Sequence, residues 1–166
     1  MASLEEALKL NLIGPGDLVA VSNNYFFSKL IRLWTKETYS HVGIVYRIMD
    51  KETSVAEAYE GTGVRFLAIK KLLPCYVFNV DGFLSEEAEE FIKEQISNKY
   101  SWRDCLRAAL RMKPKKDDKW QCAEFANAVL IKDGLNICPK AITPGSLVRE
   151  VLEKGSGRSI YIDRIK

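Results

Sequence analysis

The sequence lacks a long apolar run, an obvious repeat and a low-complexity tract. None of its apolar stretches approaches the ~20 residues that a helix needs to cross a bilayer. Its ten glycines and five prolines among 166 residues are ordinary usage. These absences exclude membrane-spanning, fibrous and disordered classes of protein. A chain of this length, 47% hydrophobic and 28% charged, is predicted to fold as a single domain over residues 1–166.

The sequence also has little of what metal sites need. It holds one histidine, and its four cysteines are spaced by 30, 17 and 16 residues with no C-x-x-C pair (Cys75, Cys105, Cys122 and Cys138). A zinc site would require an unusual arrangement of four thiolates. Neither a metal nor an organic cofactor is therefore expected.

A secretion signal is missing from the first residues, because Glu5 and Glu6 stand where a basic segment and then an apolar one would be needed. We therefore expect a protein that is made and kept in a reducing compartment, cytoplasmic or dissolved in a host cell. A viral or phage source fits this expectation. Disulfides are disfavoured in such a compartment.

Charge of one sign is also scarce. Twenty-five basic and 22 acidic residues leave a net charge of +3, and no arginine-rich stripe is present, so a nucleic-acid partner is not predicted. The densest basic stretch, residues 113–116, runs directly into Asp117 and Asp118. This pattern indicates a solvated loop that carries its own counter-charges.

The first half of the chain is rich in predicted strands. Ser3 and Glu6 form a possible capping box for a short helix that ends before Gly14. The nearly continuous apolar run over residues 41–48 predicts a central strand covered on both faces, and residues 54–59 predict its antiparallel hairpin partner. Further strands are predicted over residues 17–22, 63–67 and 75–80, and an amphipathic helix over residues 26–36.

The second half is predicted to be mainly helical. Ser85 and Ser101 begin two helices, the second of which ends before Pro114. A third helix spans about residues 121–133 and is closed by Gly134, and Thr143-Pro144 opens a fourth that ends near Gly155. An alternating strand follows over residues 159–165. Strands first and helices afterwards predict an α+β fold, with helices packed on an antiparallel sheet.

Cys122 is the first candidate for chemistry, because it falls in or near the first turn of the third helix. Unpaired N–H groups and the positive end of the helix dipole favour thiolate over thiol there. The same N–H groups could hold the oxyanion that forms when sulfur attacks a carbonyl. The alternative is that Cys122 is a small buried core residue, as free cysteines commonly are.

His41 is the second candidate, since it opens the central strand and carries the only imidazole. A neutral imidazole can take the thiol proton and later return it to a leaving group, provided that a third group orients the ring. Glu57 can do this if the hairpin register places both side chains on one face, whereas Glu60 has the opposite strand parity and abuts a turn. The alternatives are a structural histidine and surface carboxylates.

Together these residues resemble the permuted branch of the NlpC-type papain-like cysteine hydrolases, a group that includes YiiX-like bacterial proteins and related viral ones. The resemblance covers most of the chain. Its most specific element is the S-H-V-G-I-V string at residues 40–45. Weaker motifs accompany it: Gly16-Asp17-Leu18-Val19, Glu57-Ala58 followed by Gly63-Val64-Arg65, Gln121-Cys122-Ala123-Glu124-Phe125 and Thr143-Pro144.

The resemblance implies a circularly permuted papain-like fold, in which histidine and glutamate precede the cysteine instead of following it. It implies Cys122 as nucleophile, His41 as general base and acid, and Glu57 as the orienting residue; a triad depends on geometry, not chain order. Ala123 departs from the family, which usually has serine there. The backbone N–H of Cys122 is the expected oxyanion donor, and Tyr25, Tyr39 or Gln121 are candidate helpers.

The resemblance further implies a cysteine hydrolase, a peptidase or amidase, that acts through an acyl-cysteine on a small peptide, amide or acyl substrate. Cell-wall peptide hydrolysis is one activity of the wider superfamily. The alternatives are a thiol acyltransferase, a lipid thioesterase or esterase, a non-catalytic binding module, and a viral structural protein. Neither an integral membrane segment nor a particular oligomeric state is predicted.

Overall fold

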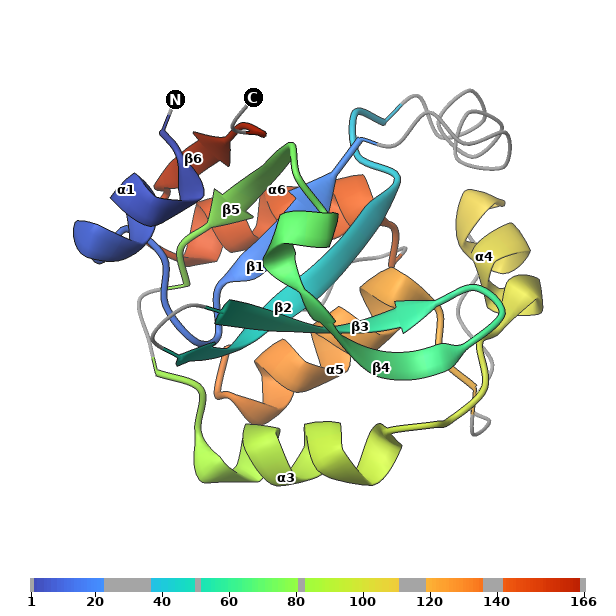
Figure 1. Ribbon diagram of the computed structural model, residues 1–166. Coiled ribbons are helices and arrows are strands. Elements are labelled where there is room, and N and C mark those ends of the chain that lie inside the picture. The colour runs from blue at the N-terminus through green and yellow to red at the C-terminus, as the bar shows by residue number, and fades with distance from the viewer. Residues whose placement is uncertain are drawn as a thin grey trace.

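A six-stranded antiparallel sheet forms the centre of the protein (Figure 1). The structure is a computed structural model and describes residues 2–22, 37–49, 52–80, 83–110, 119–135 and 142–164. The strands lie in the order β4-β3-β2-β1-β5-β6, and every neighbouring pair is antiparallel. Their bounds are β1 Leu18–Val21, β2 His41–Met49, β3 Glu52–Tyr59, β4 Gly63–Ala68, β5 Cys75–Phe78 and β6 Ser159–Ile162.

The helices begin where the sequence supplies side-chain caps. Ser3 and Glu6 form a reciprocal capping box, Ser85 and Gln121 accept from the second or third N–H of their helices, and Thr143 caps a helix with proline in its first turn. The helices are α1 Leu4–Lys9, α3 Glu86–Gln95, α4 Trp102–Ala109, α5 Cys122–Lys132 and α6 Pro144–Lys154, with the 3₁₀ helix η1 at Ile69–Lys71.

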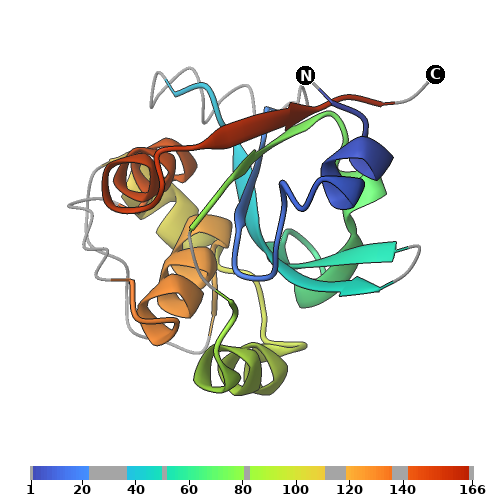
Figure 2. The same cartoon turned by 90° about the vertical axis from the view of Figure 1, so that its left-hand side faces the viewer.

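The two faces of the sheet bury two separate apolar clusters (Figure 2). Helices α3, α5 and α6 cover one face and bury the larger cluster, to which Phe125 and Leu147 contribute. Helix α1 and the η1 segment cover the other face with Ala7 and Ile69. Because β2 contributes residues to both clusters, it is covered on both sides, as its near-continuous apolar run predicts.

Most of the predicted elements are present, with differences mainly at their ends. Strand β2 is third of six and therefore central, but its last residues, Arg47 to Met49, are exposed. The 3₁₀ helix η1 was not predicted, and β6 ends at Ile162, short of the predicted end. The helix predicted over residues 26–36 lies outside the described residues.

Candidate active site

The side chains of His41 and Glu57 meet at one end of the sheet. His41 is the first residue of β2, and Glu57 lies in its hairpin partner β3, where the register places it opposite Gly43. His41 Nε2 and Glu57 Oε2 are 2.7 Å apart. A Cβ on Gly43 would lie 3.3 Å from the Cβ of Glu57 and 2.7 Å from a methyl of Val55. The absence of a side chain at Gly43 therefore leaves the space through which Glu57 reaches the ring.

Arg65 holds the second oxygen of the Glu57 carboxylate. Glu57 and Arg65 are direct partners across β3 and β4. Arg65 Nε and Nη2 donate to Glu57 Oε1 over 2.9 and 2.7 Å. The Arg65 guanidinium also lies over the Tyr59 ring, 4.0 Å from its centroid, and that ring stands edge-on to His41 at 5.9 Å. Both oxygens of Glu57 thus have strong donors, which a fully buried carboxylate requires.

The pKa of Glu57 reflects these partners. Burial alone would raise the pKa of this carboxyl, but the hydrogen bonds and charges of His41 and then of Arg65 lower it below its ordinary value. Glu57 is therefore an ionised group inside the protein. An ionised carboxylate is the form that accepts a hydrogen bond from the imidazole and stabilises the imidazolium.

Cys122 is the first residue of α5 and is 4% exposed. Gln121 caps this helix: its side-chain oxygen accepts from Ala123 N at 3.1 Å and lies 3.9 Å from Cys122 Sγ, while its Nε2 donates to the Ile142 carbonyl over 2.7 Å. The Cys122 N–H donates to no acceptor among the described residues. A free N–H beside the sulfur is suited to hold a developing oxyanion.

The Cys122 thiol and the His41 ring are neighbours. Burial alone would lower the pKa of His41, but a hydrogen bond and the negative charge from Cys122, followed by those from Glu57, raise it to about 10. The His41 ring therefore lies between a carboxylate on β3 and a sulfur at the start of α5.

Comparisons with known proteins give limited information. No protein-family model matches the chain, and no curated protein matches it. Among solved structures, the chain is similar to the crystal structure of the metalloprotein YiiX from Escherichia coli O157:H7, with a TM-score of 0.47 and 24% sequence identity. The match covers 72% of this chain and 66% of that one, so this chain spans slightly less than two thirds of YiiX.

His41 interacts with both of the other side chains that the sequence predicts, Glu57 and Cys122. Glu60 is exposed and lies in the turn after β3, as its position beside Gly61 indicates.

Two of the predicted oxyanion helpers have other partners. The Tyr39 ring packs edge-on against Tyr76 and Phe78 of β5, with centroids 5.7 and 5.6 Å away. Gln121 gives its amide to Ile142. These contacts do not support a direct role for either side chain, and Tyr25 lies outside the described residues. Of the predicted donors, the Cys122 N–H is the one without an acceptor in the described part of the chain.

Tyr100 and Cys105 form a part of the surroundings that the sequence analysis missed. The Tyr100 hydroxyl and Cys105 Sγ are 2.9 Å apart, and Cys122 acts electrostatically on both. Tyr100 is placed there because it forms a bridge with Trp120, two residues before the cysteine. Burial, with a contribution from Cys122, raises the pKa of Cys105 to about 12, so this thiol is neutral at physiological pH.

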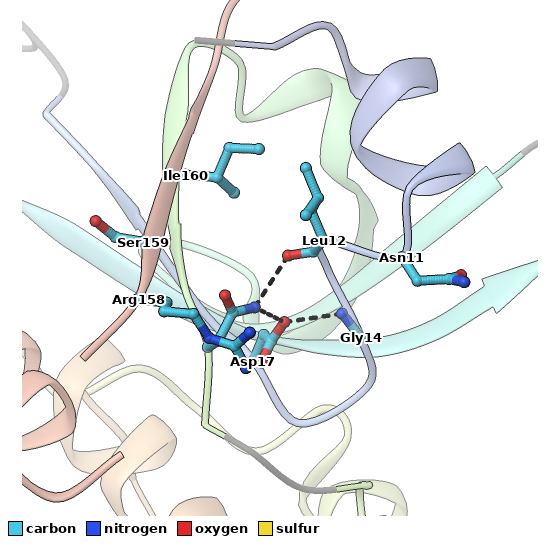
Figure 3. A pocket seen from close by; sticks show the side chains of 8 residues that line it. Asn11, Leu12, Gly14, Asp17, Arg158, Ser159 and Ile160 are labelled. Carbon is cyan, nitrogen blue, oxygen red and sulfur yellow. Dashed lines mark hydrogen bonds between the residues drawn. The ribbon is translucent and has the colours of Figure 1, made fainter. Parts of the chain in front are cut away.

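A cavity of about 430 Å³ lies away from these groups (Figure 3). Its wall includes Asp17, which directly precedes β1, whereas His41 pairs with Val21 at the far end of that strand. Asp17 accepts from Gly14 N and Asn79 Nδ2, both at 2.8 Å, and from Val80 N at 3.0 Å. This carboxylate joins the turn before β1 to the end of β5, and we assign it a structural role.

No three His, Cys, Asp or Glu side chains in the described ranges gather as metal ligands would. No helix in those ranges combines the length and the apolar character needed to cross a membrane.

Proposed function

We propose that this protein is a cysteine hydrolase with a circularly permuted NlpC-type papain-like fold. Cys122 is the nucleophile, His41 the general base and acid, and Glu57 the residue that orients and charges the imidazole. One observation carries the proposal: the only imidazole of the chain lies between a buried carboxylate and the thiol at the start of a helix. The three residues come from β2, β3 and α5, so the fold must bring them together.

The reaction begins with the thiolate of Cys122 and the imidazolium of His41. The sulfur attacks the carbonyl carbon of the substrate, a C–S bond forms, and the carbonyl electron pair moves to oxygen. The Cys122 N–H is positioned to donate to that oxygen, since it has no acceptor among the described residues. Glu57 stabilises the charged ring in this step and holds it in one orientation.

Collapse of this intermediate breaks the carbon–nitrogen bond. His41 gives its proton to the departing amine and is left neutral. The neutral ring then takes a proton from water as the water attacks the acyl-cysteine. When the C–S bond breaks, the acid is released and the thiolate–imidazolium pair is restored, so atoms and charges balance.

An amide is the substrate class that this arrangement favours. An amine is a poor leaving group unless it is protonated as the bond breaks, whereas a thiol leaves readily as its anion. A histidine whose pKa is raised to about 10 keeps that proton available at neutral pH. The acyl-transfer and thioester alternatives need the same nucleophile. They do not need a histidine that stays protonated at neutral pH, because their leaving groups depart without that proton.

Thiol labelling tests the nucleophile without a known substrate. We expect iodoacetamide at neutral pH to modify Cys122 faster than Cys75, which is buried and has a pKa raised to about 12. His41→Ala should slow modification of Cys122 by about tenfold or more, because the thiolate loses its counter-charge. Mass spectrometry of peptides containing each of the four cysteines measures both rates. Equal labelling of all four, or no effect of His41→Ala, would contradict the proposal.

A substrate panel separates hydrolysis from its alternatives. Wild-type protein is incubated with cell-wall peptides, aminoacyl amides and acyl lipids, and its intact mass is measured on rapid quenching. A mass increase equal to the acyl group, absent in Cys122→Ala, supports an acyl-cysteine. Release of free acid identifies a hydrolase, whereas transfer to an added amine or alcohol identifies an acyltransferase. Binding of a peptide by both proteins without any turnover would contradict a catalytic role.

A further inference from the structure

We propose that Arg65 is a positioning residue of this site: it fixes the Glu57 carboxylate and keeps it charged, so that His41 stays protonated beside Cys122. This inference rests on the proposed function for its consequence in catalysis. The inference itself concerns only the pKa of His41. This pKa can be measured without a substrate, and therefore separately from the proposed activity.

The geometry of the Arg65–Glu57 pair is specific to a guanidinium. Nε and Nη2 both donate to Oε1, over 2.9 and 2.7 Å, and leave Oε2 to His41 at 2.7 Å. Arginine keeps its charge at all accessible pH values and presents its N–H groups in a fixed plane. A lysine at this position would supply a point charge without the two parallel donors. The carboxylate is therefore held in position as well as neutralised.

The backbone around Arg65 is held on both sides. Toward the interior of the sheet, β4 pairs with β3 along its length. On the other side, Val64 N donates to Asn98 O at 2.9 Å and Ser97 N donates to Val64 O at 3.0 Å. Gly63 has a φ of +77°, and a Cβ there would collide with the Asn98 carbonyl. This close approach fixes the start of β4 immediately before the arginine.

Tyr59 fixes the guanidinium from a third direction. The Arg65 charge lies over its ring at 4.0 Å, a distance at which cation–π attraction is effective. Tyr59 also stands edge-on to His41. The arginine side chain is 30% exposed, so it separates the fully buried Glu57 from solvent. A carboxylate in that position without a cation would be driven towards its neutral form.

The charges around His41 come from several elements. Glu57 on β3 and Cys122 on α5 act on the ring directly, and Arg65 on β4 acts through Glu57. Beyond Cys122 lie Tyr100 and Cys105, whose pKa values are raised. Removal of Arg65 frees Oε1 of Glu57, and a carboxylate that turns away from the ring no longer raises the pKa of His41. A carboxylate that stayed in place would leave this pKa as high or higher, because a neighbouring positive charge has been removed.

The single histidine makes this measurable by proton or carbon NMR, since one imidazole signal reports one titration. We expect Arg65→Met to lower the pKa of His41 by about one unit or more, and Arg65→Lys to give a smaller decrease. Arg47→Met is the matched control. Arg47 also lies over a tyrosine ring and pairs with a glutamate, Glu89, at 3.1 Å. Unlike Arg65, it lies on an exposed part of β2. It should leave the titration of His41 unchanged.

The outcomes separate this inference from the proposed function. A lowered pKa of His41 in the arginine variants supports it, even if no amide is ever hydrolysed. An unchanged or raised pKa of His41 in folded Arg65→Met overturns it, even if the protein proves to be a hydrolase. Should Arg65→Met fail to fold, Arg65→Lys, which keeps the charge, carries the same test. In an active enzyme we expect a fall in kcat of about tenfold with KM within about twofold, because a positioning residue acts on the reacting groups rather than on substrate binding.

Discussion

Two buried carboxylates, Asp17 directly before β1 and Glu57 on β3, show how the same chemical group can serve two purposes. Asp17 is 4% exposed and Glu57 is fully buried. Asp17 accepts from two backbone N–H groups and a side-chain amide, donors that do not titrate. Glu57 accepts from an imidazole and a guanidinium. The donors, rather than the burial, therefore distinguish a structural carboxylate from one that can influence a reacting group.

The largest effect is expected at Glu57. Glu57→Gln keeps the size of the side chain but removes its charge, so the imidazolium of His41 loses its main support other than Cys122. We expect turnover of an amide substrate to fall by about 10²–10⁴-fold, the range seen when an orienting carboxylate is lost. Steady-state kinetics and the rate of Cys122 alkylation at neutral pH measure this. A fall of less than about threefold in both rates would argue against the proposed role.

Asp17→Ala should reduce the stability of the protein and leave the reactivity of Cys122 unchanged. It leaves three amide donors without this acceptor, two of them on the backbone. We expect the free energy of unfolding to fall by about 2–4 kcal/mol, since buried donors that lose their acceptor carry a desolvation cost. Urea denaturation measures this change. The alkylation rate of Cys122 in the folded fraction should stay the same, and a parallel loss of reactivity would remove the distinction drawn between the two carboxylates.

The dependence of activity on pH tests the charge state of His41. His41 has a pKa raised to about 10, so its proton is present at neutral pH and is lost as the pH rises through that value. Above it, kcat/KM for an amide should fall about tenfold per pH unit, because the amine is no longer protonated as it leaves. Alkylation of Cys122 needs only the thiolate and should not fall. If kcat/KM for an amide already falls as the pH rises through 7, His41 titrates as an ordinary histidine.

The smallest effect is expected at Glu60. This residue is exposed in the turn after β3, only three positions from Glu57. Glu60→Gln should change turnover and alkylation by less than about twofold, and stability by less than about 0.5 kcal/mol, as for most surface substitutions. The same assays used for Glu57→Gln measure it. A large loss at Glu60 would reverse the assignment of the orienting carboxylate.

Local signals in the sequence predicted most of the fold. Ser85, Gln121 and Thr143 stand at the first positions of the helices that they cap, and Gly134, with a φ of +88°, follows the end of α5. These signals depend on neighbours a few residues away, so a pattern can carry them. The ends of the strands were predicted less accurately, because pairing with a neighbouring strand decides where a strand ends. Strand β6, for example, stops at Ile162, the last residue with a partner on β5.

The surroundings of the site could be predicted only in part. The pairing of His41 with Glu57 follows from hairpin parity, a regular property of strands. Arg65 could not be assigned, because its contact requires the register across a second turn. Tyr100 was missed because its position depends on a bridge to Trp120, twenty residues further along the chain. Tyr39 was predicted as an oxyanion helper, and the contacts of its ring with Tyr76 and Phe78 of β5 had no signal in the sequence.

The bridge between Ala2 and Ile162 has a consequence for chain order. Ala2 N donates to Tyr161 O at 3.1 Å, so the two ends of the described chain lie side by side (Figure 1). A linker of a few residues could join them, and new ends could be opened between β5 and α3, since rearrangements of this kind are tolerated where termini are close. The rearranged polypeptide would place the cysteine before the histidine. The same sheet and helices could then be assembled in either order.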